Sequence, residues 1–155
     1  MDMTTVKEKL SGVFTPMVTP FQNGQILYEG IVSNVKKMNE TGLRGYFVLG
    51  TNGEFKSLSV EERMEVLKTV IKNAAPDKVV MAGTSAESTK ETIDITKEAA
   101  KLGAEMASLL MPNFFRKYMD DDAMTDYVVK VADASPIPVL LYNNPAVAGD
   151  LLISP

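Results

Sequence analysis

The 155-residue sequence contains no cysteine and no histidine. Without cysteine, the chain has no disulfide bonds, no thiolate ligands for a metal and no cysteine nucleophile. Without histidine, it lacks the most common general base and metal ligand, and it cannot carry a Ser-His-Asp triad. Proton transfer by this chain therefore depends on tyrosine, lysine, aspartate, glutamate or water.

Long apolar runs and clusters of basic residues are also missing. No run approaches the ~18 apolar residues of a membrane span, and the segment Met1–Glu8 has no secretory signal, which predicts a cytoplasmic protein. The net charge is −4 and the basic residues are dispersed, which argues against nucleic acids and anionic membranes as partners. These features favour a domain that acts on small molecules.

Short apolar runs that end in glycine, proline or asparagine recur about every thirty residues, which is the size of one βα unit. The runs are Gly12–Pro16, Gly45–Gly50, Lys78–Gly83, Ala107–Pro112 and Pro138–Asn143. Several are apolar throughout rather than alternating, as in parallel strands that are buried on both faces. The repeat therefore predicts parallel strands.

A helical pattern follows each of the first four runs. Gly42 is predicted to end the first helix and Gly103 the third. The capping-box sequence Ser59–Glu62 is predicted to open the second helix, and Ser88 the third. The acidic run Asp120–Asp122 places negative charge where the dipole of a fourth helix favours it.

This alternation predicts an α/β fold, either a doubly wound sheet or a TIM barrel. The regular period favours the barrel, and no Gly-x-Gly-x-x-Gly fingerprint supports a dinucleotide-binding sheet. A barrel needs roughly 250 residues, and Ser154-Pro155 has the pattern of a helix start. We therefore expect residues 1–155 to be a partial domain, the first five βα units of a (β/α)8 barrel truncated before the sixth strand. Its bare sheet edges would need the remainder or a partner chain.

The loops after the strands hold the candidate functional residues, because barrel active sites lie at the carboxyl ends of the strands. In Gly50–Glu54, the hydroxyl of Thr51 and the amide of Asn52 can bind an anion such as a carboxylate, although a tight turn without a ligand is an equal alternative. Tyr142 can relay a proton at the barrel mouth. Its alternative is a core tyrosine whose hydroxyl is already hydrogen bonded.

Two other features have weaker chemical interpretations. Asp120–Asp122 could bind a metal, but a solvated helix start is the favoured interpretation. No lysine lies inside a predicted strand, where a desolvated nucleophile would be expected. Lys117 is the nearest candidate, and surface exposure is favoured for it.

The loop motifs also resemble those of one known family. Gly12–Phe21, Gly50–Phe55 and Tyr142–Pro145, supported by Ala82–Thr84 and Gly103–Glu105, are similar to the dihydrodipicolinate synthase / N-acetylneuraminate lyase family. The resemblance runs from Leu10 to the end of the chain. It implies a TIM-barrel class I aldolase, usually a homotetramer, that forms a lysine Schiff base with pyruvate or another 2-oxo acid and uses no metal or other cofactor.

The same resemblance assigns roles to individual residues. Thr51 and Asn52 match the pair that binds the substrate carboxylate, and Tyr142 matches the catalytic tyrosine that moves protons. The Schiff-base lysine of the family lies on the sixth strand, beyond Pro155. The 155-residue chain alone is therefore expected to form no Schiff base.

Departures from the family pattern narrow the expected activity. Val147 stands where the synthases carry an arginine that grips a second carboxylate, and an apolar side chain cannot replace that clamp. Phe114 stands at the position of a relay tyrosine that the synthases contribute across a dimer interface. Thr51-Asn52 with Phe55, together with Val131–Val139, is similar to the 4-hydroxy-2-oxoglutarate aldolase branch.

Three functions follow in order of preference. The first is a Schiff-base 2-oxo acid aldolase or lyase that yields pyruvate and an aldehyde. The second is dihydrodipicolinate synthase itself, which condenses pyruvate with aspartate semialdehyde. The third is an inactive partial barrel that assembles through its open sheet edges.

Overall fold

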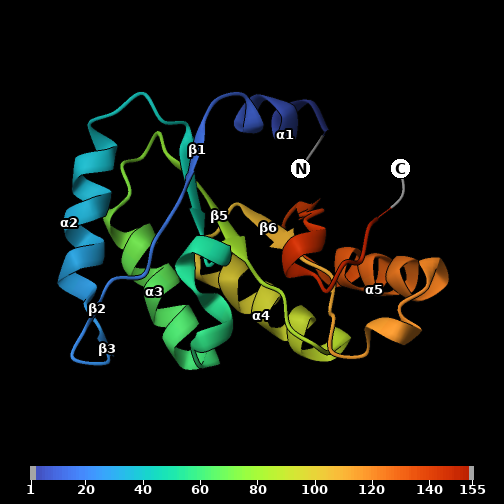
Figure 1. Ribbon diagram of the computed structural model, residues 1–155. Helices are drawn as coiled ribbons and strands as arrows, with labels where there is room; N and C mark the ends of the chain where they lie inside the picture. Colours follow the sequence, from blue (N-terminus) through green and yellow to red (C-terminus); the bar gives the residue numbers. More distant parts are fainter. Residues whose placement is uncertain (1–2, 154–155) are drawn as a thin grey trace.

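The structure is a computed structural model that describes residues 3–153 (Figure 1). The helix start expected at Ser154-Pro155 lies outside the described residues. Within the described part, one parallel sheet carries the fold and helices connect its strands.

Each predicted apolar run coincides with one strand of the main sheet, although β6 begins at Met106, one residue before its predicted run. The strands are β1 (Phe14–Pro16), β4 (Gly45–Val48), β5 (Val79–Gly83), β6 (Met106–Leu109) and β7 (Val139–Leu141). They lie in the order β1-β4-β5-β6-β7, and every neighbouring pair is parallel. The prediction of an α/β fold with a parallel sheet is confirmed.

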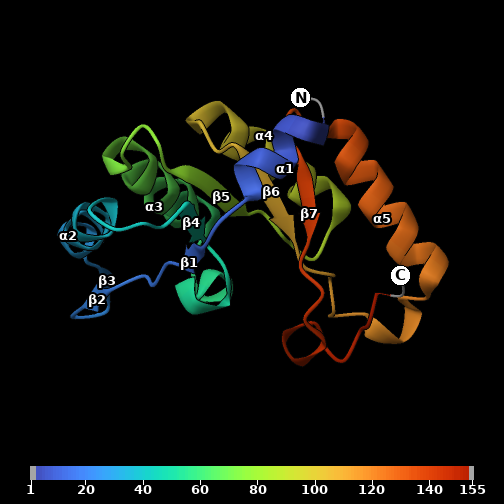
Figure 2. The same ribbon diagram turned by 90° about the horizontal axis from the view of Figure 1, so that it is seen from above.

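Four helices connect these strands: α2 (Tyr28–Asn39), α3 (Val60–Asn73), α4 (Thr89–Leu102) and α5 (Asp121–Ala134). Figure 2 shows them following one another along one side of the sheet. Each buries an apolar stripe against that side, and Val35, Val70, Ala99 and Val131 are all 0% exposed. The four helices therefore cover one face of the sheet, and a further helix, α1 (Met3–Leu10), lies at the end where the strands begin.

The predicted helix starts are confirmed in atomic detail. Ser59 and Glu62 form a reciprocal capping box at α3, in which Glu62 N donates to Ser59 Oγ at 3.2 Å and Ser59 N donates to Glu62 Oε2 at 2.8 Å. Ser88 caps α4, and Asp120 caps α5 by accepting from Ala123 N at 2.9 Å. Gly103 ends α4 in the left-handed conformation, with φ of 110°.

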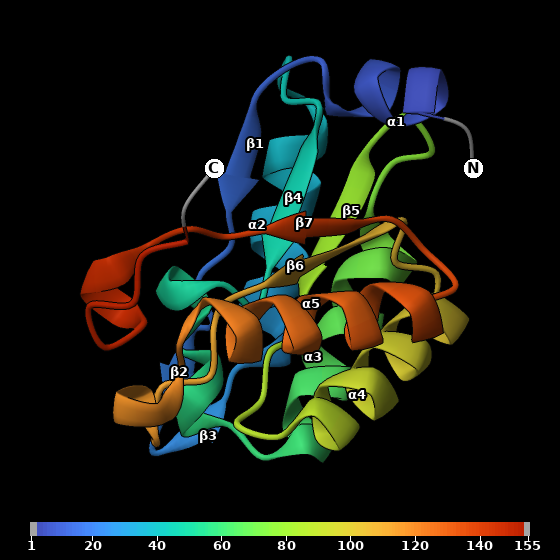
Figure 3. The same ribbon diagram turned by 90° about the vertical axis from the view of Figure 1, so that its right-hand side faces the viewer.

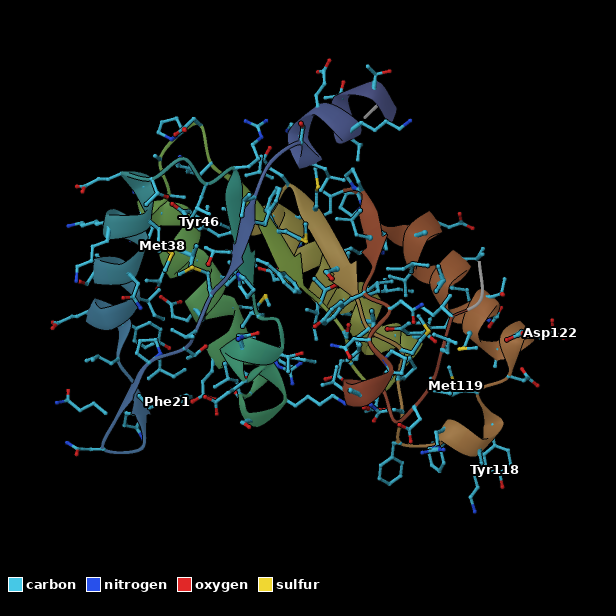
Figure 4. The ribbon with its side chains drawn as sticks, turned by 45° about the horizontal axis from the view of Figure 1, so that its top comes forward. Phe21, Met38, Tyr46, Tyr118, Met119 and Asp122 are labelled. Atoms are coloured by element: carbon cyan, nitrogen blue, oxygen red, sulfur yellow. The ribbon has the colours of Figure 1, made fainter. Side chains whose placement is uncertain are left out.

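The predicted end of the first helix was wrong, because α2 stops at Asn39 and not at Gly42. Asn39 Oδ1 accepts from the Tyr46 hydroxyl at 2.6 Å and from Ala75 N at 2.9 Å, and Asn39 Nδ2 donates to Asn73 O at 2.8 Å. These bonds tie the ends of α2 and α3 to the fully buried Tyr46 of β4, close to Met38 (Figure 4). Tertiary contacts therefore decide where this helix ends.

Several short elements were not predicted. They are α1, the hairpin of β2 (Phe21–Gln22) and β3 (Gln25–Ile26), and the 3-10 turns η1 (Thr51–Gly53), η2 (Phe55–Ser57), η3 (Arg116–Tyr118) and η4 (Pro145–Val147). Within the described residues, β7 is followed by η4 rather than by a helix.

Helix α1 packs where the strands of the sheet begin (Figure 3). Its buried Val6 forms an apolar cluster with Val79 and Met106, the first residues of β5 and β6. Lys9 forms an ion pair with Glu105, and Arg44 Nε donates to Lys9 O at 3.0 Å. The loops at the carboxyl ends of the strands thus lie at the opposite end of the sheet from α1.

Candidate functional site

The loop after β4 presents the two predicted anion-binding residues. Turn η1 is fixed by Gly53 N, which donates to Gly50 O at 3.0 Å, and by the Thr19 hydroxyl, which donates to Gly53 O at 2.8 Å. Thr51 and Asn52 are exposed, and neither side chain forms a hydrogen bond with the part of the chain that the structure describes. A hydroxyl and an amide are therefore available to a ligand on a fixed turn.

A close backbone contact sets the direction of this loop. Leu49 is buried and lies in the left-handed region with φ of 61°, where a non-glycine residue is uncommon. A Cβ atom on Gly83 would lie 2.2 Å from Leu49 O. Gly83 therefore allows the end of β5 to approach the backbone that leads into Thr51.

Tyr142 immediately follows β7 and is half-buried. Its backbone N donates to Leu109 O at 2.7 Å, which continues the pairing with β6. Its ring meets Phe47 edge to face at 5.8 Å, and its hydroxyl accepts from Asn144 Nδ2 at 2.9 Å. The hydroxyl is thus hydrogen bonded, as expected for a core tyrosine. Its partner is the side-chain amide of Asn144, which lies only two residues away in the sequence.

Thr51 and Tyr142 border the same narrow crevice, with a volume of about 10 Å³, at the carboxyl ends of the strands. Asn52 is not among the residues that line it in the described part of the chain. The fold therefore brings together two of the three predicted site residues, from loops about ninety positions apart in the sequence.

The crevice also contains the hydroxyl groups of Ser85, which lies in a loop after a predicted strand, and of Ser108, which sequence reasoning missed. Ser85 Oγ accepts from Leu110 N at 2.7 Å, so this hydroxyl holds together the loops after β5 and β6. Ser108 is 5% exposed, and its hydroxyl forms no side-chain hydrogen bond with the described residues. A serine within the apolar run of β6 was the only signal for it.

Glu87 connects the loops around the crevice and was also missed. Its carboxylate accepts from Asn113 N and Phe114 N, both at 2.9 Å, and pairs with Lys56 Nζ at 3.1 Å. Burial alone would raise the pKa of this carboxyl, but the hydrogen bonds from Phe114, Lys56 and Asn113 bring it below its ordinary value. Glu87 therefore holds the loops after β4 and β6 in place as a carboxylate.

A second cavity, of about 210 Å³, lies beside Glu87 and has charged walls. Lys56, Arg63 and Glu91 also line it. The Arg63 guanidinium lies 5.3 Å from the centre of the Phe55 ring, and its burial lowers the pKa of that group. No sequence motif indicated this cluster.

The loop after β6 is largely exposed. Phe114 is 77% and Phe115 67% exposed, and their rings meet edge to face at 4.9 Å. Lys117 is exposed, as predicted, and Tyr118 of the same turn points away from the sheet (Figure 4). Phe114 thus offers an apolar surface rather than a phenol.

Neither a metal-binding cluster nor a membrane-spanning helix is found in the part of the chain that the structure describes. Residues 3–153 contain no group of three or more acidic side chains that could hold a metal ion. Among the helices described there, none combines the length and apolar character needed to cross a membrane.

Comparisons with known proteins place this chain in one family. The profile of the Dihydrodipicolinate synthetase family matches residues 9–154. The chain is 37% identical over 139 residues to a 4-hydroxy-tetrahydrodipicolinate synthase of Methanothrix thermoacetophila, covering 89% of this chain and 46% of that protein. It is 34% identical over 149 residues to a probable mitochondrial 4-hydroxy-2-oxoglutarate aldolase of Emericella nidulans, covering 92% of this chain and 48% of that protein.

Solved structures give the same result. The dihydrodipicolinate synthase of Acinetobacter baumannii complexed with pyruvate has a TM-score of 0.84 at 32% identity, covering 89% of this chain and 47% of that one. A catalytic lysine mutant of the Ruminococcus gnavus sialic acid aldolase has a TM-score of 0.86 at 28% identity, covering 95% and 48%. The chain spans about half the length of the curated relatives it matches.

Proposed function

The chain belongs to the Dihydrodipicolinate synthetase family of lyases, and from this premise we propose that its protein is a Schiff-base-forming aldolase. The enzyme would make or break a carbon–carbon bond between pyruvate and an aldehyde. The observation that supports this proposal is that Thr51 and Tyr142, from loops far apart in the sequence, border one crevice at the carboxyl ends of the parallel strands. The relative solved with pyruvate supports the choice of 2-oxo acid.

The roles of the site residues follow from their chemistry. The free side chains of Thr51 and Asn52 would bind the pyruvate carboxylate. The Tyr142 hydroxyl would carry the proton that moves as the aldol oxygen is formed or cleaved, and Asn144 Nδ2 would hold that hydroxyl in position. Asn144 can donate to the hydroxyl oxygen while the phenol donates its own proton elsewhere.

The amine of the Schiff base would come from outside these residues. No lysine borders the crevice within residues 3–153. The related sialic acid aldolase has a catalytic lysine, and this chain covers only 48% of the length of that aldolase. We therefore propose that β1, β4, β5, β6 and β7 are the first five strands of a (β/α)8 barrel, whose remaining part supplies the lysine. In the family's homotetramer, the exposed Phe114 and Phe115 would face another subunit.

Dihydrodipicolinate synthase is the second candidate, because it is the activity of a relative that is 37% identical. Val147 argues against it, since aspartate semialdehyde carries a second carboxylate and valine offers no charge to bind it. Steady-state assay with that aldehyde separates the two candidates.

The first test is the intact mass of the native gene product before and after pyruvate and borohydride. The lysine amine would attack the oxo carbon of pyruvate, water would leave, and borohydride would reduce the C=N bond. We expect a gain of one reduced pyruvate per subunit. A protein that turns over substrate but gives no adduct would contradict the Schiff base.

The second test is Tyr142→Phe in the same protein, which removes the hydroxyl and keeps the ring contact with Phe47. We expect kcat to fall by about 10²–10⁴-fold, the usual contribution of a general acid–base group. Tyr118→Phe is the matched control, because it removes a phenol that is 77% exposed. Equal turnover in both variants would refute the role of Tyr142.

A further inference from the structure

Asparagine is followed by glycine at two places in the sequence, Asn23-Gly24 and Asn52-Gly53. Asparagine in this pair readily loses ammonia, because glycine has no side chain to shield its backbone nitrogen or to restrict the turn. The glycine nitrogen attacks Cγ of the asparagine side chain and ammonia leaves, which closes a five-membered succinimide ring. Water then opens the ring and gives aspartate or isoaspartate. The reaction therefore requires a glycine nitrogen without a hydrogen bond and a turn that can change its shape.

Asn23-Gly24 meets both requirements. The pair forms the turn between β2 and β3, which are two residues long each, and both residues are exposed. Gly24 N forms no hydrogen bond with residues 3–153, and an added Cβ on Gly24 would meet nothing within 4 Å. Figure 2 shows the hairpin at the margin of the described structure, away from the main sheet. This turn can therefore open without disturbing the core.

Asn52-Gly53 is the same pair of residues in a turn that is held in place. Gly53 N donates to Gly50 O at 3.0 Å, and Gly53 O accepts from the buried hydroxyl of Thr19 at 2.8 Å. An added Cβ on Gly53 would lie 3.2 Å from Met17 O, so the backbone is also closely packed there. These partners all belong to the described residues, so their contacts do not depend on the remainder of a barrel. Ring closure at Asn52 therefore requires both hydrogen bonds of Gly53 to break first.

We infer that Asn23 is a site of spontaneous deamidation and that the hydrogen bonds of Gly53 protect Asn52 from the same reaction. Conversion of Asn52 would place a negative charge beside Thr51, where it would repel the substrate carboxylate. Only this consequence rests on the proposed function. The difference in reactivity rests on the two turns alone.

The experiment maps both peptides by mass spectrometry while the native gene product is incubated at mildly alkaline pH, folded and in urea. In urea, the two asparagines should convert at similar rates, since each is followed by glycine. In the folded protein, Asn52 should convert at least about tenfold more slowly than Asn23, because two hydrogen bonds lower the population of the open turn by about that factor.

Two results would overturn the inference. Conversion of Asn52 in the folded protein as fast as that of Asn23 would refute the protection. Survival of Asn23 in the folded protein, together with its conversion in urea, would refute its assignment as the modification site.

Thr19→Val tests the protection directly, because it removes the hydroxyl that donates to Gly53 O and keeps the bond from Gly53 N to Gly50 O. The conversion of Asn52 should become faster in this variant. The conversion of Asn23 should keep its rate, which makes Asn23 an internal reference in the same molecule.

Thr41→Val is the matched control, since it removes an exposed threonine hydroxyl from a different loop. An equal rate at Asn52 in the two variants would refute the role of Thr19. The comparison of Asn52 with Asn23 in the wild-type protein decides the inference if Thr19→Val does not fold.

Asn52→Asp imitates one product of the reaction and tests its consequence for the site. It should raise KM for pyruvate, whereas Asn23→Asp should leave KM unchanged. An unchanged KM in Asn52→Asp would refute the consequence for the substrate carboxylate. Absence of pyruvate trapping by borohydride would refute the proposed aldolase, whereas the peptide maps decide the difference in reactivity in either case.

Discussion

Substitution of Gly83 by alanine tests whether a backbone contact positions the candidate site. Gly83 is the last residue of β5, and an added Cβ would lie 2.2 Å from Leu49 O and 2.9 Å from Leu49 C. The first distance is more than an ångström inside the 3.4 Å at which ordinary contact begins. Because both partners are backbone atoms, β5 and the loop after β4 must separate.

The expected loss of stability is that of an overpacked core position, about 1–3 kcal/mol. The functional loss should be larger, because Leu49 lies two residues before Thr51. A displacement of about one ångström at a substrate-positioning group can lower the rate by about 10²-fold. We therefore expect Gly83→Ala to raise KM for pyruvate as well as to lower the free energy of unfolding.

Urea unfolding and steady-state kinetics of the native gene product measure the two effects. Gly42→Ala is the matched control, because an added Cβ there meets nothing within 4 Å. That substitution should leave stability unchanged or raise it by about 0.4–1 kcal/mol. If Gly83→Ala behaves like Gly42→Ala in both assays, the contact with Leu49 does not position the site.

Two further predictions concern buried polar groups. Burial raises the pKa of Tyr127 to about 12. Above about pH 10 this tyrosine therefore ionises in the unfolded chain but stays protonated in the folded one. The free energy of unfolding should fall by roughly 2–3 kcal/mol between about pH 10 and pH 12. Because burial also raises the pKa of Tyr28 and Tyr46, Tyr127→Phe should reduce this fall in urea titrations at several pH values rather than abolish it, and Tyr118→Phe should leave it unchanged. Asn39→Ala leaves the Tyr46 hydroxyl without its acceptor and should cost about 2–3 kcal/mol by the same measurement. Tyr46→Phe removes the donor of the same bond and leaves the other bonds of Asn39 in place, so unchanged stability in that variant would contradict the assigned bond.

The strands and helix starts could be predicted because their signals are local. An apolar run such as Val79–Gly83 needs both faces buried, and Ser59 finds its partner Glu62 within one turn of helix. The hairpin of β2 and β3 also had a local signal, since Asn23-Gly24 suits a turn with positive φ, and these residues have φ of 52° and 76°. That signal was overlooked, whereas α1 had little signal because few of its residues are buried.

The candidate site could be predicted only in part. The position rule for barrel loops selected Thr51 and Tyr142, because it depends on strand order and not on side-chain contacts. Glu87 could not be predicted because its partners are the backbone N–H groups of Asn113 and Phe114. These groups contact Glu87 only after two loops have folded together. Ser108 could not be predicted because the side on which a strand residue projects is known only when the register of the sheet is known.

The order of the strands has a consequence for how the molecule folds. If the separate β2-β3 hairpin is set aside, each strand of the main sheet pairs with the strand that precedes or follows it in the sequence. Every pairing therefore closes a loop of similar, modest length. Such a sheet can grow from any adjacent pair, one unit at a time. Helix α1 is the exception, because Val6 rests on Val79 and Met106. We therefore expect the first segment of the chain to dock only after β5 and β6 have formed, although it precedes both in the sequence.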